Sequence, residues 1–275
     1  MRIDQQLQDS LAYIRRFTQI QPRIGLILGS GLGDFADTLE NADKIATSEI
    51  PHYPPSTVEG HKGYLVFGTV RGIPVVAVQG RTHFYEGHRI DQVAYVVRIM
   101  DLMGVKKLIV TNAAGGVNPY FQPGDLMIIV DHINFLFRNP LRGPVVPPEP
   151  RFPDMYANYH PPYIELLESI GLELGIPLKK GVLFVSTGPS YETAAEVRMV
   201  RRLGGDAVSM STVPEVLVAR ARGMKVAGIS CITNLATGIS ATPLSHDEVT
   251  QIANRVKNTF QKLVRELILR MDKTD

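Results

Sequence analysis

The 275-residue sequence predicts an α/β fold with a parallel or mixed sheet covered by helices. Short apolar runs rich in β-branched residues indicate buried strands. Longer segments with apolar residues three or four apart indicate helices, and the two kinds of segment alternate along the chain. A chain of this length forms one large domain or two small ones. We find no internal repeat and no long linker, so residues 1–275 are expected to form a single domain.

The expected strands are too short for helices, and they are Ile24–Leu28, Tyr64–Val70, Pro74–Gln79, Leu108–Thr111, Leu126–Val130, Val182–Ser186, Asp206–Met210 and Lys225–Thr233. The expected helices lie between them at Gln5–Phe17, Ile90–Met103, Tyr163–Leu174, Thr193–Leu203, Pro214–Arg222 and Asp247–Arg270. Three helix starts have the spacing of a capping box, at Thr193 and Glu196, Thr212 and Glu215, and Ser245 and Glu248.

Each of these three helices follows a strand after a loop of modest length. The segments Tyr191–Glu192, Met210–Ser211 and Asn234–His246 should therefore lie at the carboxyl ends of strands. Open α/β sheets bind their ligands at these ends. The sequence thus predicts that loops from distant parts of the chain converge on one rim of the sheet.

Composition excludes several classes of protein. The 29 basic and 27 acidic residues give a net charge of +2, which argues against the concentrated basic face of a nucleic-acid binder. The single cysteine, Cys231, excludes a disulfide scaffold and a cysteine-based metal cluster, and it is typical of a reducing cytosol. No apolar run approaches membrane-spanning length, and the polar N-terminus does not resemble a signal peptide. We therefore expect a cytoplasmic protein that binds neither nucleic acid nor membrane.

The stretch from Arg138 to Pro162 is the most irregular, since it holds eight of the chain's 19 prolines. Inside a compact domain such a segment is usually a functional loop or an interface arm. From composition alone, a passive surface excursion is the simpler interpretation.

A glycine loop, Gly29-Ser30-Gly31-Leu32-Gly33, follows the first strand. Glycines allow positive φ and let successive N–H groups point at an anion. The loop does not match the dinucleotide-binding, Walker or nucleophile-elbow patterns. It indicates either a site for a phosphate oxygen that uses the Ser30 hydroxyl or an ordinary tight turn.

Residues 79–88, with the sequence QGRTHFYEGH, are dense in polar side chains directly after a strand. The planar guanidinium of Arg81 suits a phosphate, and His83 can donate to an anion or exchange a proton. The spacing of His83, Glu86 and His88 matches neither common zinc motif, so we expect no metal. A lone histidine is usually structural, but the neighbouring Arg, Tyr and Glu favour a functional role here.

Polar residues also end the later strands. Asn112, in the string TNAAGG, is an amide that needs partners when buried. Asn234 ends a strand where an apolar residue is expected, which suggests recognition of a flat polar ligand. Simpler interpretations exist for Glu192, Met210 and His246, namely a helix-dipole interaction, core filling and surface exposure.

Taken together, nine segments resemble the trimeric purine nucleoside phosphorylases, in the order of that family and over nearly the whole chain. They are GSGLGDFAD (29–37), VEGHKGYLVFG (58–68), QGRTHFYEGH (79–88), VTNAAGGVN (110–118), NPLRGP (139–144), RFPDM (151–155), GPSYETAAEVR (188–198), DAVSMSTVPEV (206–216) and CITN (231–234). The resemblance implies a central mixed β-sheet with a distorted barrel surrounded by helices, a homotrimer, and no metal or other cofactor. It implies a pentosyl transfer of purine salvage: a purine ribonucleoside or 2′-deoxyribonucleoside and inorganic phosphate, the co-substrate, give the base and the pentose 1-phosphate.

The resemblance also implies a role for each matching residue. The phosphate-binding residues would be Ser30, His61, Arg81, His83, Asn112, Ala113 through its N–H, and Ser211. The ribose contacts would be Tyr85, Met210 and His246, and the base contacts Tyr191, Glu192, Asn234 and, from the neighbouring subunit, Phe152. The catalytic residues would be His83, Glu86 and Asn234, with Glu86 positioning the phosphate site. The proline-rich stretch, which carries Phe152, would then be an interface arm.

Breaking the glycosidic bond builds negative charge on the purine, so the chemistry calls for donors placed in advance. Asn234 can donate to purine N7, and Glu192 can accept from the N1–H of hypoxanthine or guanine, which adenine lacks. We therefore expect inosine and guanosine as substrates and adenosine as a very poor one. Tyr191, Ser209 and Leu235 replace Phe, Gly and Lys of the mammalian members, so the preference between inosine and guanosine stays open.

Three alternatives belong to other classes. A methylthioadenosine phosphorylase would be expected to have Asp at position 234 and no carboxylate at position 192. A nucleoside hydrolase would need an activated water, commonly on aspartate-bound calcium, and the sequence has no Asp-rich cluster. A nucleoside-binding protein without activity would not need an anion site and a base site at one sugar.

Overall fold

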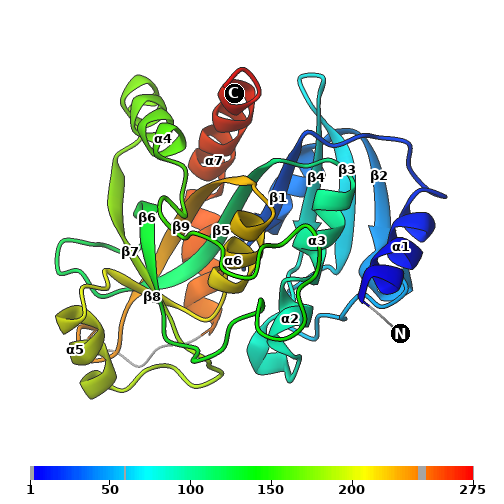
Figure 1. Cartoon of the computed structure of the whole chain (residues 1–275). Coiled ribbons are helices and arrows are strands. Elements are labelled where there is room, and N and C mark those ends of the chain that lie inside the picture. The colour runs from blue at the N-terminus through cyan, green and yellow to red at the C-terminus, as the bar shows by residue number, and fades with distance from the viewer. Residues whose placement is uncertain (1–2, 59, 241–245, 275) are drawn as a thin grey trace.

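The computed structural model describes residues 3–58, 60–240 and 246–274, and in them nine strands form one mixed sheet (Figure 1). The strands are β1 (Ile24–Leu28), β2 (Glu40–Ala46), β3 (Tyr64–Val70), β4 (Ile73–Gln79), β5 (Lys107–Gly116), β6 (Leu126–Asn134), β7 (Leu178–Val185), β8 (Ala207–Ser209) and β9 (Lys225–Leu235). The α-helices are α1 (Ile3–Ile14), α2 (Ile90–Val93), α3 (Tyr95–Leu102), α4 (Pro161–Leu174), α5 (Ala194–Arg202), α6 (Val213–Ala221) and α7 (His246–Met271). Short 3-10 helices lie at Gly33–Thr38, Thr47–Glu49 and Phe84–Glu86.

The sheet closes on itself over part of its width. Its strand order is β2-β3-β4-β1-β5-β8-β7-β6-β9, and β9 also pairs with β5. Strands β5, β8, β7, β6 and β9 therefore form a closed barrel, and β1, β4, β3 and β2 extend the sheet away from it (Figure 1). Parallel pairs, such as β1 with β4, lie beside antiparallel ones, such as β3 with β4. The predicted mixed sheet with a barrel is confirmed.

Helices cover both faces of the sheet. In β1, Ile27 belongs to a core that includes residues of α1, α3 and α6. Leu26 and Leu28 belong to a second core, with residues of α4 and α7. Helix α5 covers β7 and β8 through Val197 and Val200. All of β1 is buried, which explains why its sequence, IGLIL, is continuously apolar rather than alternating.

The structure departs from the predicted elements in three places. Strand β2 is missing from the prediction because this edge strand is mostly exposed and its sequence, ENADKIA, has no apolar run. The helix expected at Ile90–Met103 divides at Ala94, where ψ is 9°. The capping box expected at Thr212 and Glu215 is wrong, since Thr212 has a φ of 81° and its side chain caps nothing. Both side chains turn instead toward the functional site described below.

The carboxyl ends of the central strands meet at one rim. Strand β1 is parallel to β4 and to β5, and β5 is parallel to β9. The carboxyl ends of these four strands therefore lie on the same side of the sheet. Strand β8 ends beside them, because it pairs with the last residues of β5. A confirmed capping box, with Thr193 as N-cap and Glu196 as its reciprocal partner, starts α5 directly after Tyr191–Glu192. The convergence that the sequence predicts is therefore present.

The proline-rich stretch forms an irregular arm between β6 and α4, and a buried ion pair network anchors it. Glu149 of the arm accepts from Nε of Arg98 at 2.7 Å and from Nε of Arg222 at 2.9 Å, and these side chains are almost fully buried. Beyond this anchor, Phe152 and Tyr156 are 89% and 84% exposed. The arm is thus fixed at its base and presents aromatic rings at its surface.

Residues 241–245 lie outside the described part of the chain, and with them Ser245 of the third expected capping box. In the part that is described, no helix has the length and apolar character needed to cross a membrane.

Candidate active site

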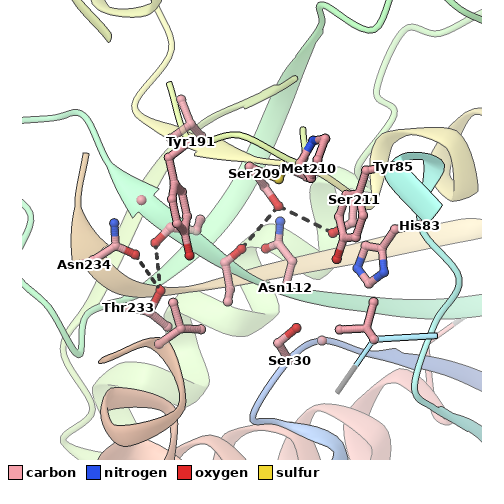
Figure 2. Close-up of a pocket in the computed structure, with 18 of the residues that line it drawn as sticks. Ser30, His83, Tyr85, Asn112, Tyr191, Ser209, Met210, Ser211, Thr233 and Asn234 are labelled. Atoms are coloured by element: carbon pink, nitrogen blue, oxygen red, sulfur yellow. Dashed lines mark hydrogen bonds between the residues drawn. The ribbon is translucent and has the colours of Figure 1, made fainter. Parts of the chain in front are cut away.

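A cavity of about 400 Å³ opens at the rim where the strands end. Eleven of the predicted site residues line this one cavity: Ser30, Arg81, His83, Tyr85, Asn112, Ala113, Tyr191, Glu192, Met210, Ser211 and Asn234. Figure 2 shows Asn234 and Thr233 on one side of it and His83 and Tyr85 on the other, with Asn112 between them. The residues predicted for an anion and those predicted for a base thus face a common space.

Four predicted site residues are not among those that line the cavity. His61 lines a smaller adjoining cavity of about 170 Å³. Glu86 lies behind His83 and contacts it directly. Phe152 lies on the arm with its ring in solvent. His246 begins α7, and its side chain lies outside the described residues.

The glycine loop after β1 lets two strand ends come very close. A Cβ on Gly29 would lie 2.6 Å from Cα of Asn112 and 2.9 Å from the carbonyl oxygen of Thr111, so a larger residue does not fit. The N–H of Gly29 donates to Oγ1 of Thr111 at 3.1 Å. This packing brings Ser30 and Asn112 to the same wall of the cavity.

Asn112 is buried and has its amide oriented by a neighbour. Its Oδ1 accepts from Oγ of Ser230 at 2.6 Å, and its Nδ2 has no hydrogen-bond partner among the described residues. An unpaired buried donor is costly, so such groups are usually satisfied by a ligand or by water. Nδ2 is therefore a buried donor without a protein partner, on a residue that lines the cavity.

Arg81 is 2% exposed and is held by the protein on several sides. Its Nη1 donates to Oγ1 of Thr212 at 2.9 Å and to Oε1 of Glu215 at 3.3 Å. Its Nη2 donates to the carbonyl oxygens of Ile27, at 3.2 Å, and Thr111. The two Nη atoms, which the sequence suggests for a phosphate, thus donate to protein acceptors. The Nε–H has no partner among the described residues.

Glu86 fixes the tautomer of His83. Burial alone would raise the pKa of Glu86, but hydrogen bonds from His83 and Thr57 outweigh it and lower this pKa to about 2. The ionised carboxylate accepts from the backbone N–H of His83 at 2.6 Å and contacts its Nδ1 at 3.2 Å. Because an ionised carboxylate only accepts, Nδ1 must carry a proton. Burial lowers the pKa of His83, so the ring is neutral near pH 7 and Nε2 is left as an acceptor.

His61 lines the smaller cavity and contacts Ser30, which lines both cavities. Its Nδ1 lies 2.9 Å from the carbonyl oxygen of Arg81, and its Nε2 lies 3.3 Å from Oγ of Ser30. Burial, helped by the nearby His83, lowers the pKa of His61 to about 4. The imidazole is therefore neutral at physiological pH, with Nδ1 donating and Nε2 accepting.

Beside His83, the cavity combines an aromatic ring with an apolar side chain and hydroxyl groups. The ring of Tyr85 stacks on that of His83 with centroids 4.7 Å apart, and burial raises the pKa of Tyr85 to about 12, so its hydroxyl keeps its proton. Met210 supplies an apolar surface. The Ser209 hydroxyl donates to the carbonyl oxygen of Ala113 at 3.2 Å (Figure 2). A sugar, with one apolar face and several hydroxyls, suits this region.

At the other end, hydrogen bonds set the direction of two polar groups. Thr233 donates to Oδ1 of Asn234 at 3.0 Å, which leaves Nδ2 as the donating end of the amide. Ser186 donates to Oε1 of Glu192 at 2.7 Å, which leaves Oε2 to accept from a ligand. Tyr191 is 41% exposed at the mouth of the cavity. One donor, one acceptor and one ring suit a flat heterocycle with both kinds of polar edge.

Among residues 3–58, 60–240 and 246–274, no three His, Cys, Asp or Glu side chains gather in a way that could hold a metal ion.

Comparison with known proteins accounts for this arrangement. Residues 23–269 match the family described as the phosphorylase superfamily. Purine nucleoside phosphorylase 1 of Bacillus subtilis is 54% identical over 95% of this chain and 97% of its own length. The enzyme of the same name from Geobacillus stearothermophilus is 51% identical over 97% and 98% of the two chains. This chain belongs to the purine nucleoside phosphorylase family.

Solved structures of this family show the same fold. The purine nucleoside phosphorylase of Schistosoma mansoni, in complex with inosine, superposes with a TM-score of 0.91 at 36% identity. The match covers 96% of this chain and 95% of the other. A second structure of that enzyme, in complex with adenosine, also gives a TM-score of 0.91, at 37% identity over 96% of both chains.

The side chains around the cavity are held by others behind them, and the sequence motifs did not predict several of these roles. Thr212, Glu215 and Ser186 are examples. Glu215 could have been recognised from the sequence, because it lies in the apolar helix segment VPEVLVA. A buried carboxylate without a partner is costly, so this position indicates a buried cationic or hydrogen-bonding partner. Ser186 gives no such signal, because a serine at a strand end is common.

Proposed function

We propose that this chain catalyses the phosphorolysis of 6-oxopurine nucleosides, inosine and guanosine, to the free base and the pentose 1-phosphate. One observation carries the proposal. Two residues with unpaired donors suited to an anion and an oriented donor–acceptor pair suited to a purine line one and the same cavity. The family membership, at 54% and 51% identity over nearly the whole chain, supports the same reaction.

The residues of the anion end suit an attacking phosphate. Nδ2 of Asn112 and Nε of Arg81 offer hydrogens, and neutral His83 offers an acceptor for a protonated phosphate oxygen. Ser30, Ser211 and the Ala113 N–H complete the proposed phosphate site. A phosphate held here attacks C1′ of the sugar as the C–N bond breaks, so the new C–O bond forms with inversion. Holding both reactants in line removes much of the entropic barrier.

The departing purine gains negative charge, and the Asn234 amide can stabilise this charge by donating a hydrogen bond. Its Nδ2 donates to N7 of the base, an interaction that strengthens as charge builds and therefore lowers the barrier. Glu192 accepts from the N1–H of a 6-oxopurine. Adenine presents a lone pair at N1 instead, so the two would repel.

The closest competing function is that of a methylthioadenosine phosphorylase. The residues at positions 192 and 234 are Glu and Asn, which favour a 6-oxopurine over a 6-aminopurine. The binding of adenosine by the Schistosoma enzyme concerns occupancy of that enzyme's pocket. Discrimination by the present chain is therefore tested as relative turnover, not as binding.

The exposed end of the arm supports a homotrimer in which Phe152 reaches a neighbouring subunit's base site. The ring is 89% exposed although Glu149, three residues earlier, is buried in a network of charged groups. Such a rigid arm with an apolar tip is typical of an interface. A cytoplasmic location belongs to this proposal too, because the single cysteine is buried as a free thiol.

The deciding assay follows hypoxanthine release from inosine with and without inorganic phosphate. Phosphorolysis requires that release stops when phosphate is omitted and that one ribose 1-phosphate forms for each hypoxanthine. Equal release without phosphate, with free ribose as the product, would show a hydrolase and contradict the proposal.

A further inference from the structure

Arg81 has almost no free hydrogen to give to a ligand. A guanidinium carries five N–H hydrogens, two on each Nη and one on Nε. The four Nη hydrogens match four protein acceptors, namely Oγ1 of Thr212, Oε1 of Glu215 and the carbonyl oxygens of Ile27 and Thr111. Arg81 lines the cavity, and its Nε–H has no partner in the described part of the chain. The direction of this hydrogen is therefore set by the four acceptors on the Nη atoms.

One of these acceptors is held by a strained backbone. Thr212 has φ 81° and ψ −48°, and the N–H of Val213 donates to the carbonyl oxygen of Ser211 at 3.0 Å. This is the rare γ-turn with positive φ. A β-branched residue at positive φ is a true outlier, and such strain persists where the surroundings over-determine it, commonly near functional sites. In this conformation the hydroxyl of Thr212 makes no cap bond to the helix that follows and accepts from Nη1 of Arg81 instead.

The second acceptor brings a negative charge to the buried end of the site. The side chains of Glu215 and Arg81 are 1% and 2% exposed, and Nη1 lies 3.3 Å from Oε1. The other oxygen, Oε2, has no partner among the described residues. Glu215 thus offsets the charge of Arg81, and in a region of low dielectric it also opposes any anion bound in the cavity.

We infer that Thr212 and Glu215 are positioning residues for the phosphate site that act through Arg81: Thr212 fixes the direction of its Nε–H, and Glu215 sets the net charge that a bound phosphate meets. The inference rests on the proposed function and adds two residues to it. Neither residue lines the cavity, so neither acts by touching the substrate.

A matched pair of variants at Thr212 tests the first half. Thr212→Val keeps the β-branched shape but removes the acceptor, so the KM for phosphate should rise about tenfold while the KM for inosine stays within about twofold. Thr212→Ser restores a hydroxyl and should return the phosphate KM to within about twofold of wild type. Thr212→Gly removes the hydroxyl, and glycine adopts the positive φ without strain. This variant therefore tests the loss of the hydroxyl if the valine variant does not fold. It should again raise the phosphate KM about tenfold.

Glu215→Gln tests the second half. The amide oxygen still accepts from Nη1, but the negative charge is gone, so the KM for phosphate should fall about threefold or more. Asp101→Asn is the control, because Asp101 accepts from the buried Arg222 in an ion pair whose two residues lie outside the cavity wall. That variant should leave the phosphate KM within about twofold of wild type.

The rise in melting temperature on adding inorganic phosphate gives a second readout that needs no turnover. A phosphate KM and a thermal shift that stay at wild-type values in both Thr212→Val and Thr212→Gly would overturn the role of Thr212. A phosphate KM that rises or stays unchanged in Glu215→Gln would overturn the role of Glu215. Hypoxanthine release by the wild type without phosphate would instead contradict the proposed function, and the thermal shifts would still test the two positioning roles.

Discussion

The hydroxyl of Thr233 donates to Oδ1 of Asn234 over 3.0 Å, and both residues lie on the wall of the cavity. This bond decides which end of the Asn234 amide accepts and which end donates. Nδ2 donates to the carbonyl oxygen of Leu235 at 3.2 Å. The protein itself thus orients the donor that we propose for purine N7.

Removal of this donor should slow turnover strongly. We expect Asn234→Ala to lower kcat for inosine by on the order of a hundredfold, by analogy with the loss of one preorganised donor to a developing negative charge. Steady-state kinetics at saturating phosphate measure it. Asn158→Ala is the control, because Asn158 is also buried but lies outside the cavity wall. A kcat for Asn234→Ala within a few-fold of wild type would refute the role.

Glu192 should decide between 6-oxopurines and 6-aminopurines. Glu192→Gln replaces an acceptor with a group that can also donate, so it can meet the N1 lone pair of adenine. We expect the ratio of kcat/KM for inosine to that for adenosine to fall by about a hundredfold or more. Glu196→Gln, on the first turn of α5 and outside the cavity wall, should leave the ratio unchanged. An unchanged ratio in Glu192→Gln, or comparable kcat/KM for both nucleosides in the wild type, would remove Glu192 from base recognition.

His61 should make stability fall as the pH falls. Burial lowers the pKa of His61 in the folded protein from 6.5 to about 4. Between these two values the unfolded chain binds more protons than the folded one, so the free energy of unfolding rises with pH. As the pH drops through this window, the free energy of unfolding of the wild type should therefore fall by on the order of 3 kcal/mol because of His61. The His61→Asn variant should lack this contribution of His61 to the fall. Denaturant titrations at a series of pH values measure the difference, and identical slopes for the two proteins would contradict this environment for His61.

Phe152 should contribute to catalysis only through a neighbouring subunit. If the arm completes the neighbour's base site, Phe152→Ala should raise the KM for inosine about tenfold and leave the KM for phosphate within about twofold. Tyr156→Ala removes another exposed aromatic ring of the same arm as a control. Light scattering coupled to size exclusion gives the mass in parallel. A monomeric wild-type enzyme, or an unchanged inosine KM in a trimeric variant, would count against the proposal.

Much of the fold could be predicted because buried strands have short apolar sequences and the helices between them have clear periodicity. β1 is an example, since burial on both faces requires the continuous apolar run IGLIL. β2 could not be found in this way, because an edge strand with one exposed face carries no such run. The break at Ala94 has no sequence signal either, since no Gly or Pro marks it.

The site could be predicted as a set of residues but not as a set of contacts. Capping-box spacing predicted three loops at strand ends, and residues of all three line the cavity. The same spacing gave a wrong prediction at Thr212 and Glu215, because both side chains accept hydrogen bonds from the buried Arg81 instead of capping the helix. Which acceptors surround Arg81 depends on Ile27 and Thr111, which are far from it in sequence. Only the fold brings these acceptors together.

The central claim is that an anion and a purine occupy opposite ends of one cavity, and a crystal structure of the enzyme grown with phosphate and hypoxanthine tests it most directly. We predict phosphate within hydrogen-bond distance of Asn112 Nδ2 and His83, and hypoxanthine within hydrogen-bond distance of Asn234 Nδ2 and Glu192, with room for one pentose between them. Phosphate and hypoxanthine in separate cavities, or hypoxanthine with no contact to Asn234 and Glu192, would contradict it.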